Sequence, residues 1–129
     1  MLTRDQILAP RKPIIESIAI PEWGGDVLVR VPTPSQIEAF ESKTNFLRAA
    51  GNTLVGLRAR IAILACCDED GAPIFTAADE AALMKGEGNL GPLQKISDWL
   101  SPRVGWSADE VEKRAKNSQP TEGDASSSV

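Results

Sequence analysis

The fold is decided by the apolar segment Leu54-Val55-Gly56-Leu57-Arg58-Ala59-Arg60-Ile61-Ala62-Ile63-Leu64-Ala65-Cys66-Cys67. After it come an acidic turn and the segment Ala72-Pro73-Ile74-Phe75. Leu54, Leu57, Ile61 and Leu64 recur at steps of three and four, which predicts a helix with both arginines on the opposite side. From Ile61 to Cys67 no face of this helix carries polar side chains. A helix that is apolar all round has to be covered by neighbouring elements. We therefore place this helix at the centre of the fold, with Ile61 and Leu64 in the core. The β-branched isoleucines keep a buried strand as the alternative.

Working outward, the sequence before this helix predicts a β-hairpin at about residues 14–31. Residues 14–20 and 27–31 alternate apolar and polar side chains, and the glycine-containing segment 21–26 between them supplies a turn. A lone hairpin is marginal in water and leaves two unpaired edges. We therefore expect its apolar face to lie on helices or its edges to join a second copy. That face comprises Ile18, Ile20, Val27 and Val29.

Four helix-start signals flank these elements. A threonine or serine followed three residues later by Gln, Asp or Glu is a capping box, and it occurs at Thr3, Thr33, Thr76 and Ser107. Pro92 suits a first helical position and precedes an apolar stripe of Leu93, Ile96 and Leu100. The sequence therefore predicts an α+β fold, mainly α-helical after residue 33, with one N-terminal β-hairpin packed on a helical core.

The domain organisation follows from composition. A chain of 129 residues with 42% hydrophobic residues can bury its own core, and we place a single domain at 1–117. Residues 118–129 are small and polar, so we predict a disordered polar tail there. The first residues carry no apolar leader and no stretch is long enough to span a bilayer, which predicts a cytosolic protein without membrane contact. The net charge of -4 and the absence of a dense basic cluster argue against nucleic-acid partners.

Residue types that carry catalysis are scarce. The chain has no histidine, which removes Ser-His-Asp and Cys-His activation and the usual zinc sites. Asp68-Glu69-Asp70-Gly71 has the letters of a calcium loop, but both end ligands are missing. Gly86-Glu87-Gly88-Asn89-Leu90-Gly91 follows a predicted helix rather than a strand, so we interpret it as a connector and not as a dinucleotide site. We expect no enzyme, no cofactor and no metal site.

The remaining prominent side chains are cysteines and aromatics. Cys66 and Cys67 are adjacent, and a disulfide between neighbours is strained, so we predict two reduced core thiols. Trp23, on the hairpin tip, is the leading candidate for contact with a partner, and Trp99 suits a core or interface stripe. The full candidate partner-binding set is Trp23, Val27, Val29, Phe40 and Trp99.

Four stretches resemble the tail assembly chaperones of long-tailed (siphovirus-type) bacteriophages and prophages. They are Leu2-Thr3-Arg4-Asp5-Gln6-Ile7-Leu8, residues 18–30 around Pro21-Glu22-Trp23-Gly24-Gly25, residues 67–76 around Asp68-Glu69-Asp70-Gly71, and Glu112-Lys113-Arg114-Ala115-Lys116-Asn117-Ser118. Their order and spacing frame nearly the whole chain.

The resemblance implies a non-enzymatic chaperone that coats the tape measure protein, helps recruit tail tube subunits and leaves before the tail is finished. Such proteins form multimers, so we expect a homo-oligomer in the host cytoplasm that is absent from the mature virion. In many of them a ribosomal frameshift adds a second segment that reaches the tube protein. This chain ends in Ser126-Ser127-Ser128-Val129 and would correspond to the shorter product. The alternative is a small structural subunit of the tail or head-tail connector that remains in the particle.

Overall fold

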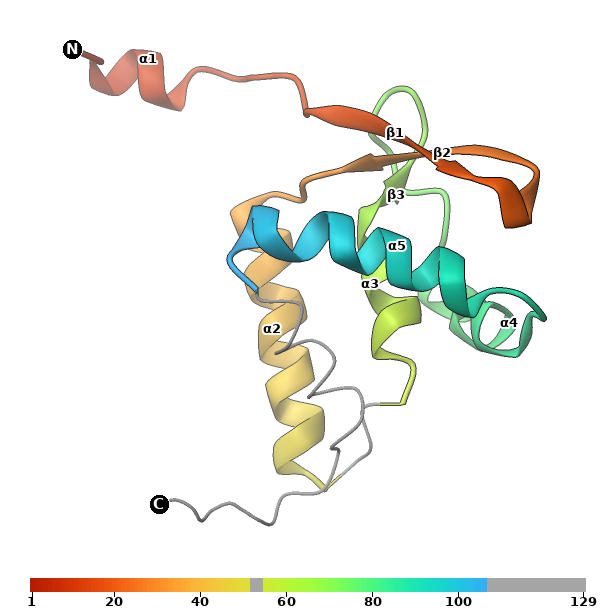
Figure 1. Cartoon of the computed structure of the whole chain (residues 1–129). Helices are drawn as coiled ribbons and strands as arrows, with labels where there is room; N and C mark the ends of the chain where they lie inside the picture. Colours follow the sequence, from red (N-terminus) through yellow and green to blue (C-terminus); the bar gives the residue numbers. More distant parts are fainter. Residues whose placement is uncertain (52–54, 107–129) are drawn as a thin grey trace.

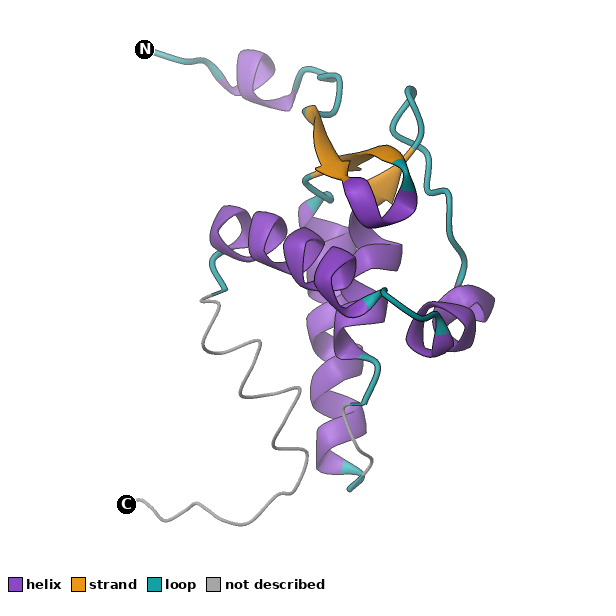
Figure 2. Ribbon diagram, turned by 45° about the vertical axis from the view of Figure 1, so that its right-hand side comes forward, coloured by secondary structure: helices purple, strands orange, loops and turns teal. Residues whose placement is uncertain are grey.

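The structure is a computed structural model that describes residues 1–51 and 55–106. Leu54, the helix predicted to open at Ser107, the domain boundary at 117 and the polar tail at 118–129 lie outside the described residues. The predicted fold class, α+β and mainly helical, is confirmed: one small antiparallel sheet lies at one end of a set of helices (Figures 1 and 2).

The sheet contains the predicted hairpin and one further strand. Strand β1 (Ile15–Ile20) pairs antiparallel with β2 (Gly25–Arg30), with Ile18 opposite Val27. A single 3₁₀ turn, η1 (Pro21–Trp23), connects them and ends at Gly24, whose φ of 81° is left-handed and favours glycine. The apolar face of the hairpin packs on the helices as expected, because Ile20, Val27 and Val29 are buried in the core.

The third strand corrects the predicted end of the central helix. That helix, α3 (Leu57–Ala65), stops before the cysteines, and Cys66 and Cys67 form β3, which pairs antiparallel with β2 opposite Val29 and Leu28. Cys66 adopts extended backbone angles, φ -72° and ψ 133°, since pairing with β2 satisfies its backbone better than one more helical turn would. The hairpin was predicted to leave two unpaired edges, but β2 also pairs with β3, so of the two hairpin strands only β1 is an edge strand of the described sheet.

Capping boxes start the helices as predicted. In α1 (Arg4–Leu8) and α2 (Pro34–Ala49), the threonine Oγ1 accepts the N–H of the glutamine at 3.2 Å, and the glutamine Oε1 accepts the threonine N–H at 2.9 Å. The box at Thr76 opens η2 (Ala77–Asp79), which continues into α4 (Glu80–Lys85). These signals are local, and each forms in the structure.

Helix α5 (Leu90–Leu100) lies across α3 and continues into η3 (Ser101–Val104) (Figure 1). It begins two residues before the predicted start, so Pro92 is its third residue rather than its first. A third residue also lacks an intrahelical acceptor for its N–H, so proline fits there too. The predicted stripe of Leu93, Ile96 and Leu100 is buried.

The core lies between the sheet, α3 and α5. Ile61 is 1% exposed, as predicted. Leu64 was predicted to be a core residue but is only partly buried, because the buried side of α3 is formed by Leu57, Ile61 and Ala65, and Leu64 lies on its flank. Small buried side chains on α3 let neighbouring elements pack close to the helix; they are Ala59, Ala62 and Ala65, all fully buried.

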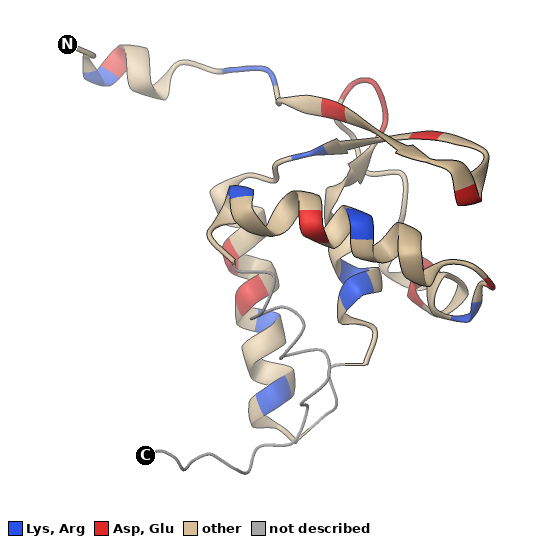
Figure 3. Cartoon of the chain, in the orientation of Figure 1, with Lys and Arg blue, Asp and Glu red and all other residues tan. Residues whose placement is uncertain are grey.

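Two segments project from this body. Helix α2 extends away from the sheet, and residues 1–14 form an arm that leaves the start of β1 and carries α1 outward (Figures 1 and 2). Lysines and arginines are spread over several elements, while the acidic turn 68–70 forms one cluster of negative charge (Figure 3). Within the described residues, no helix combines the length and apolarity that crossing a membrane requires.

Candidate partner-binding groove

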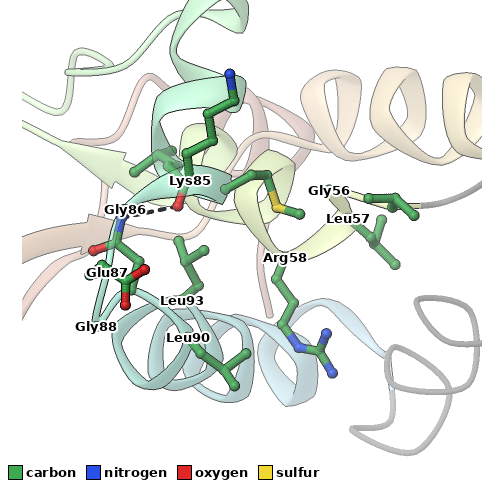
Figure 4. Close-up of a pocket in the computed structure, with 13 residues that line it drawn as sticks. Gly56, Leu57, Arg58, Lys85, Gly86, Glu87, Gly88, Leu90 and Leu93 are labelled. Carbon is green, nitrogen blue, oxygen red and sulfur yellow. Dashed lines mark hydrogen bonds between the residues drawn. The ribbon is translucent and has the colours of Figure 1, made fainter.

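A hollow of about 360 Å³ lies where the start of α3, the helix α4 and the start of α5 meet (Figure 4). Its base is apolar, since Leu57, Leu83 and Leu93 are buried core residues that line it. We call this hollow the α3–α4–α5 groove. A concave surface with an apolar base is the usual form of a binding site.

The rim of the groove is apolar as well. Val55 is 61% exposed, Met84 44% and Leu90 71%, and all three line the same hollow. Exposed apolar side chains that gather around a concavity mark interaction surfaces, whereas scattered ones need no explanation. Methionine adapts its shape to different apolar partners, which suits Met84 to a binding site.

The third wall is the glycine-containing link between α4 and α5, and Asn89 holds it in place. Asn89 Nδ2 donates to the Leu83 carbonyl at 3.0 Å, and Asn89 Oδ1 accepts the Trp23 Nε1–H at 2.8 Å. The link was predicted to be a connector, and it connects the two helices as expected. This hydrogen bond therefore joins the link to the hairpin turn that carries Trp23.

The start of α3 is fixed by an ion pair. Arg60 Nη1 donates to Glu80 Oε2 at 3.2 Å and to the Val55 carbonyl at 3.3 Å. Gly56 has a φ of 93°, and a Cβ on it would lie 2.6 Å from Glu80 Oε2. The positive φ favours glycine at this position, and a larger residue would also displace the Glu80 carboxylate from its place beside Arg60.

Charged groups surround the apolar surface. Arg58 lines the groove, and its Nε donates to Gln94 Oε1 at 2.6 Å, while Gln94 Nε2 donates to Asp98 Oδ1 at 2.7 Å. This chain of hydrogen bonds orients the guanidinium of Arg58. Lys85 and Glu87 also line the hollow, on the side of the glycine-containing link (Figure 4). The groove can thus receive apolar side chains and pair with a carboxylate at the Arg58 end.

A second hollow, of about 270 Å³, lies beside β3 and is lined by Arg30, Cys66 and Cys67 among others. Arg30 closes part of it, because its Nη1 donates to the Gly71 carbonyl at 3.0 Å. Burial, and to a lesser extent Cys67, raises the pKa of the Cys66 thiol to about 12. Burial also raises the pKa of Cys67, although Arg30 opposes that shift. Both cysteines are free and buried, as predicted, and their raised pKa values make them poor nucleophiles.

Two predicted partner-binding residues belong to the core. Val29 is fully buried and Val27 nearly so, because β2 is the central strand and its inner face lies on the helices. Neither side chain presents surface to a partner, so the structure removes both from the candidate site.

The three predicted aromatic residues make contacts within the chain. Phe40 stacks against Trp106 with ring centroids 5.4 Å apart, and Trp106 Nε1–H donates to Glu41 Oε2 at 2.7 Å. Trp99 Nε1–H donates to Glu16 Oε1 at 3.2 Å, and the Arg103 guanidinium lies 4.3 Å from its ring centroid. Trp99 thus ties β1 to α5, and Phe40 ties α2 to the segment that follows η3. Trp23 reaches the groove only through Asn89, so its role in partner contact stays a prediction.

The sequence reasoning missed the residues that form the groove: Val55, Arg58, Met84, Lys85, Glu87 and Leu90. One signal for them exists in the sequence. Met84 and Leu90 are large apolar residues on either side of Gly86 and Gly88, and apolar residues that bracket a glycine-containing link are brought together when the link turns. Val55 carries no such signal.

Among the described residues, no group of three or more His, Cys, Asp or Glu side chains could hold a metal ion. The fold and the groove together define a small α+β domain with an apolar hollow where α3, α4 and α5 meet. No family model and no curated protein matches the chain. Among solved structures, the chain is similar to one described as the structure of bacteriophage HK97 tail assembly chaperone, with 20% sequence identity and a TM-score of 0.46, over 74% of this chain and 89% of that chain.

Proposed function

We propose that this protein is a tail assembly chaperone of a long-tailed bacteriophage or prophage, and that it binds an apolar segment of the tape measure protein in the α3–α4–α5 groove. The observation that carries the proposal is the apolar groove, where Val55, Met84 and Leu90 are exposed around a hollow of about 360 Å³. The sequence resemblance described above supplies the identity of the client.

The groove suits a client that has to be covered and later released. Burying an exposed side chain of this size contributes about 1.5–3 kcal/mol when the burial is complete, and these three are already partly covered. Their gross contribution of about 3–6 kcal/mol is comparable to the cost of association. One groove therefore binds weakly, and many copies along a long client hold it together through multivalency. Weak individual contacts allow the chaperone to leave when tube subunits arrive.

The charge of the chain supports the same role. The net charge of -4 keeps the protein soluble while it exposes apolar surface, and charged Arg58, Lys85 and Glu87 surround that surface. In this proposal the protein acts in the host cytoplasm without catalysis or cofactor, as a homo-oligomer. Recruitment of tail tube subunits belongs mainly to a longer frameshift product, and the chaperone is absent from the finished virion.

Co-expression tests the proposal. The tagged protein is produced together with the tape measure protein of the same phage or prophage, and the complex is captured on the tag. We expect capture by the wild type and a loss of more than about tenfold for Leu90→Asp, because the charge enters the apolar rim. The matched control is Phe46→Asp on α2, where the side chain is 69% exposed and does not line the groove.

Two results would refute parts of this proposal. Equal capture by the wild type and Leu90→Asp would remove the groove as the client site. Stoichiometric amounts of the protein in purified virions, measured by mass spectrometry, would replace the chaperone with the alternative, a structural subunit of the tail or head-tail connector.

A further inference from the structure

The N-terminal arm, residues 1–14, is a second exposed apolar surface. Its helix α1 buries none of its residues, and Leu2, Ile7 and Leu8 are all half or more exposed. The helix is nevertheless capped at both ends: the box of Thr3 and Gln6 closes its start, and Arg11 Nη2 donates to the Ile7 carbonyl at 2.9 Å. A helix this short is marginal on its own in water. Two caps and exposed apolar side chains on so short a helix are features expected of a segment that docks on a partner.

The point where the arm leaves the body is fixed. Pro13 lies against Gly71 in the acidic turn, since a Cβ on Gly71 would lie 2.8 Å from Pro13 Cγ. Pro10 and Pro13 restrict the backbone between α1 and β1, so this connection is stiff. Both views show α1 held away from the helices (Figures 1 and 2).

In the described structure, α1 lies away from α4 and therefore away from the groove of the same chain (Figures 1 and 2). Trp23 marks the groove end of the hairpin through its bond to Asn89, and Pro13 lies near the opposite end of β1. The six-residue strand between them spans about 20 Å. The chain from Pro13 back to Leu8, the last residue of α1, reaches at most about 17 Å when fully extended, which is less than the length of this strand. The length of this segment does not limit docking of Leu8 in the groove of a second copy, because the two chains can approach each other freely.

The charges on the two surfaces match. Asp5 and Leu8 are three residues apart, so they lie on the same side of α1. The groove offers a complementary pair, the guanidinium of Arg58 oriented by Gln94 and the exposed apolar side chain of Leu90. Asp5 is almost fully exposed and its contact with Arg4 is only a 3.5 Å surface pair, so it is available to a partner.

We propose that the arm of one copy docks in the α3–α4–α5 groove of the next copy, with Leu8 in the apolar hollow and Asp5 on Arg58. The contact joins two different surfaces, so it is head-to-tail and produces rings or open chains rather than a closed two-fold dimer. An apolar client that binds the groove competes with the arm. The docking itself needs no client, so this inference does not depend on the proposed function.

Sedimentation velocity of the full chain alone, over a wide concentration range, tests the docking. We expect concentration-dependent oligomers for the wild type and a weakening of more than about tenfold for Leu8→Asp, because a charge replaces the apolar anchor. At concentrations where both proteins are monomeric, the melting temperature should be the same, since α1 buries no residue within the chain. Glu69→Arg, in the exposed acidic turn, is the control for a change of charge and should sediment like the wild type.

A charge swap tests the pairing. Asp5→Arg and Arg58→Glu should each weaken assembly about twofold to fivefold, the range for a partly exposed ion pair, and the double variant should recover the wild-type behaviour. A wild type that remains monomeric at millimolar concentration, or oligomers that survive Leu8→Asp, would overturn the inference. Loss of client capture with these oligomers intact would refute the proposed function and leave the docking standing.

Discussion

Replacing Ile61 by alanine tests the position of the core. The side chain of Ile61 is 1% exposed, and the change removes about three carbon atoms, each worth about 0.8 kcal/mol of transfer free energy. The cavity that remains adds to this loss of about 2.4 kcal/mol, so we expect the free energy of unfolding to fall by about 3–4 kcal/mol. Urea unfolding, followed by tryptophan fluorescence and far-UV circular dichroism, measures this change.

Leu64→Ala is the matched comparison on the same helix. Leu64 is only partly buried, so the same kind of truncation should cost about 1–2 kcal/mol. Leu90→Ala, on the exposed rim of the groove, should leave stability almost unchanged. A cost below about 1 kcal/mol for Ile61→Ala, or a larger cost for Leu64→Ala than for Ile61→Ala, would refute the described packing of α3.

Three further predictions follow from local contacts. Thr33→Ala should lower stability by about 1 kcal/mol in thermal unfolding, whereas Thr3→Ala should not change it, because α1 packs on nothing in the described chain. Cys66 should resist iodoacetamide at pH 8 until urea unfolds the protein, as read by mass spectrometry, since its pKa of about 12 leaves almost no thiolate. Glu41→Ala and Trp106→Phe should each cost about 1–3 kcal/mol and be non-additive in a double-mutant cycle; full additivity would contradict their hydrogen bond.

The sequence predicts those parts of the fold that depend on neighbouring residues. Capping boxes at Thr3, Thr33 and Thr76 act within one helical turn, so they appear as expected. The hairpin and the stripe of α5 follow from periodicity for the same reason. The fold class could therefore be predicted without tertiary information.

The remaining features depend on partners far apart in the chain. Cys66 and Cys67 form a strand only because β2 offers them an edge, and periodicity within their own segment cannot show this. Trp23 and Asn89 are 66 residues apart, so a prominent aromatic on a turn looks free in the sequence although it is bonded. The groove collects residues from α3, α4 and α5, and its shape exists only after these helices pack.

Binding of the client in the α3–α4–α5 groove can be observed directly at one residue of the groove. The chain has two methionines, Met1 in the arm and Met84 in the groove, so a sample labelled with ¹³C at the methionine methyl groups gives two NMR signals. The purified tape measure protein of the same phage or prophage is titrated into this sample. If the groove binds this client, the Met84 signal shifts or broadens until it saturates, and Leu90→Asp abolishes the change. Binding that is shown by co-sedimentation while the Met84 signal stays unperturbed would contradict it.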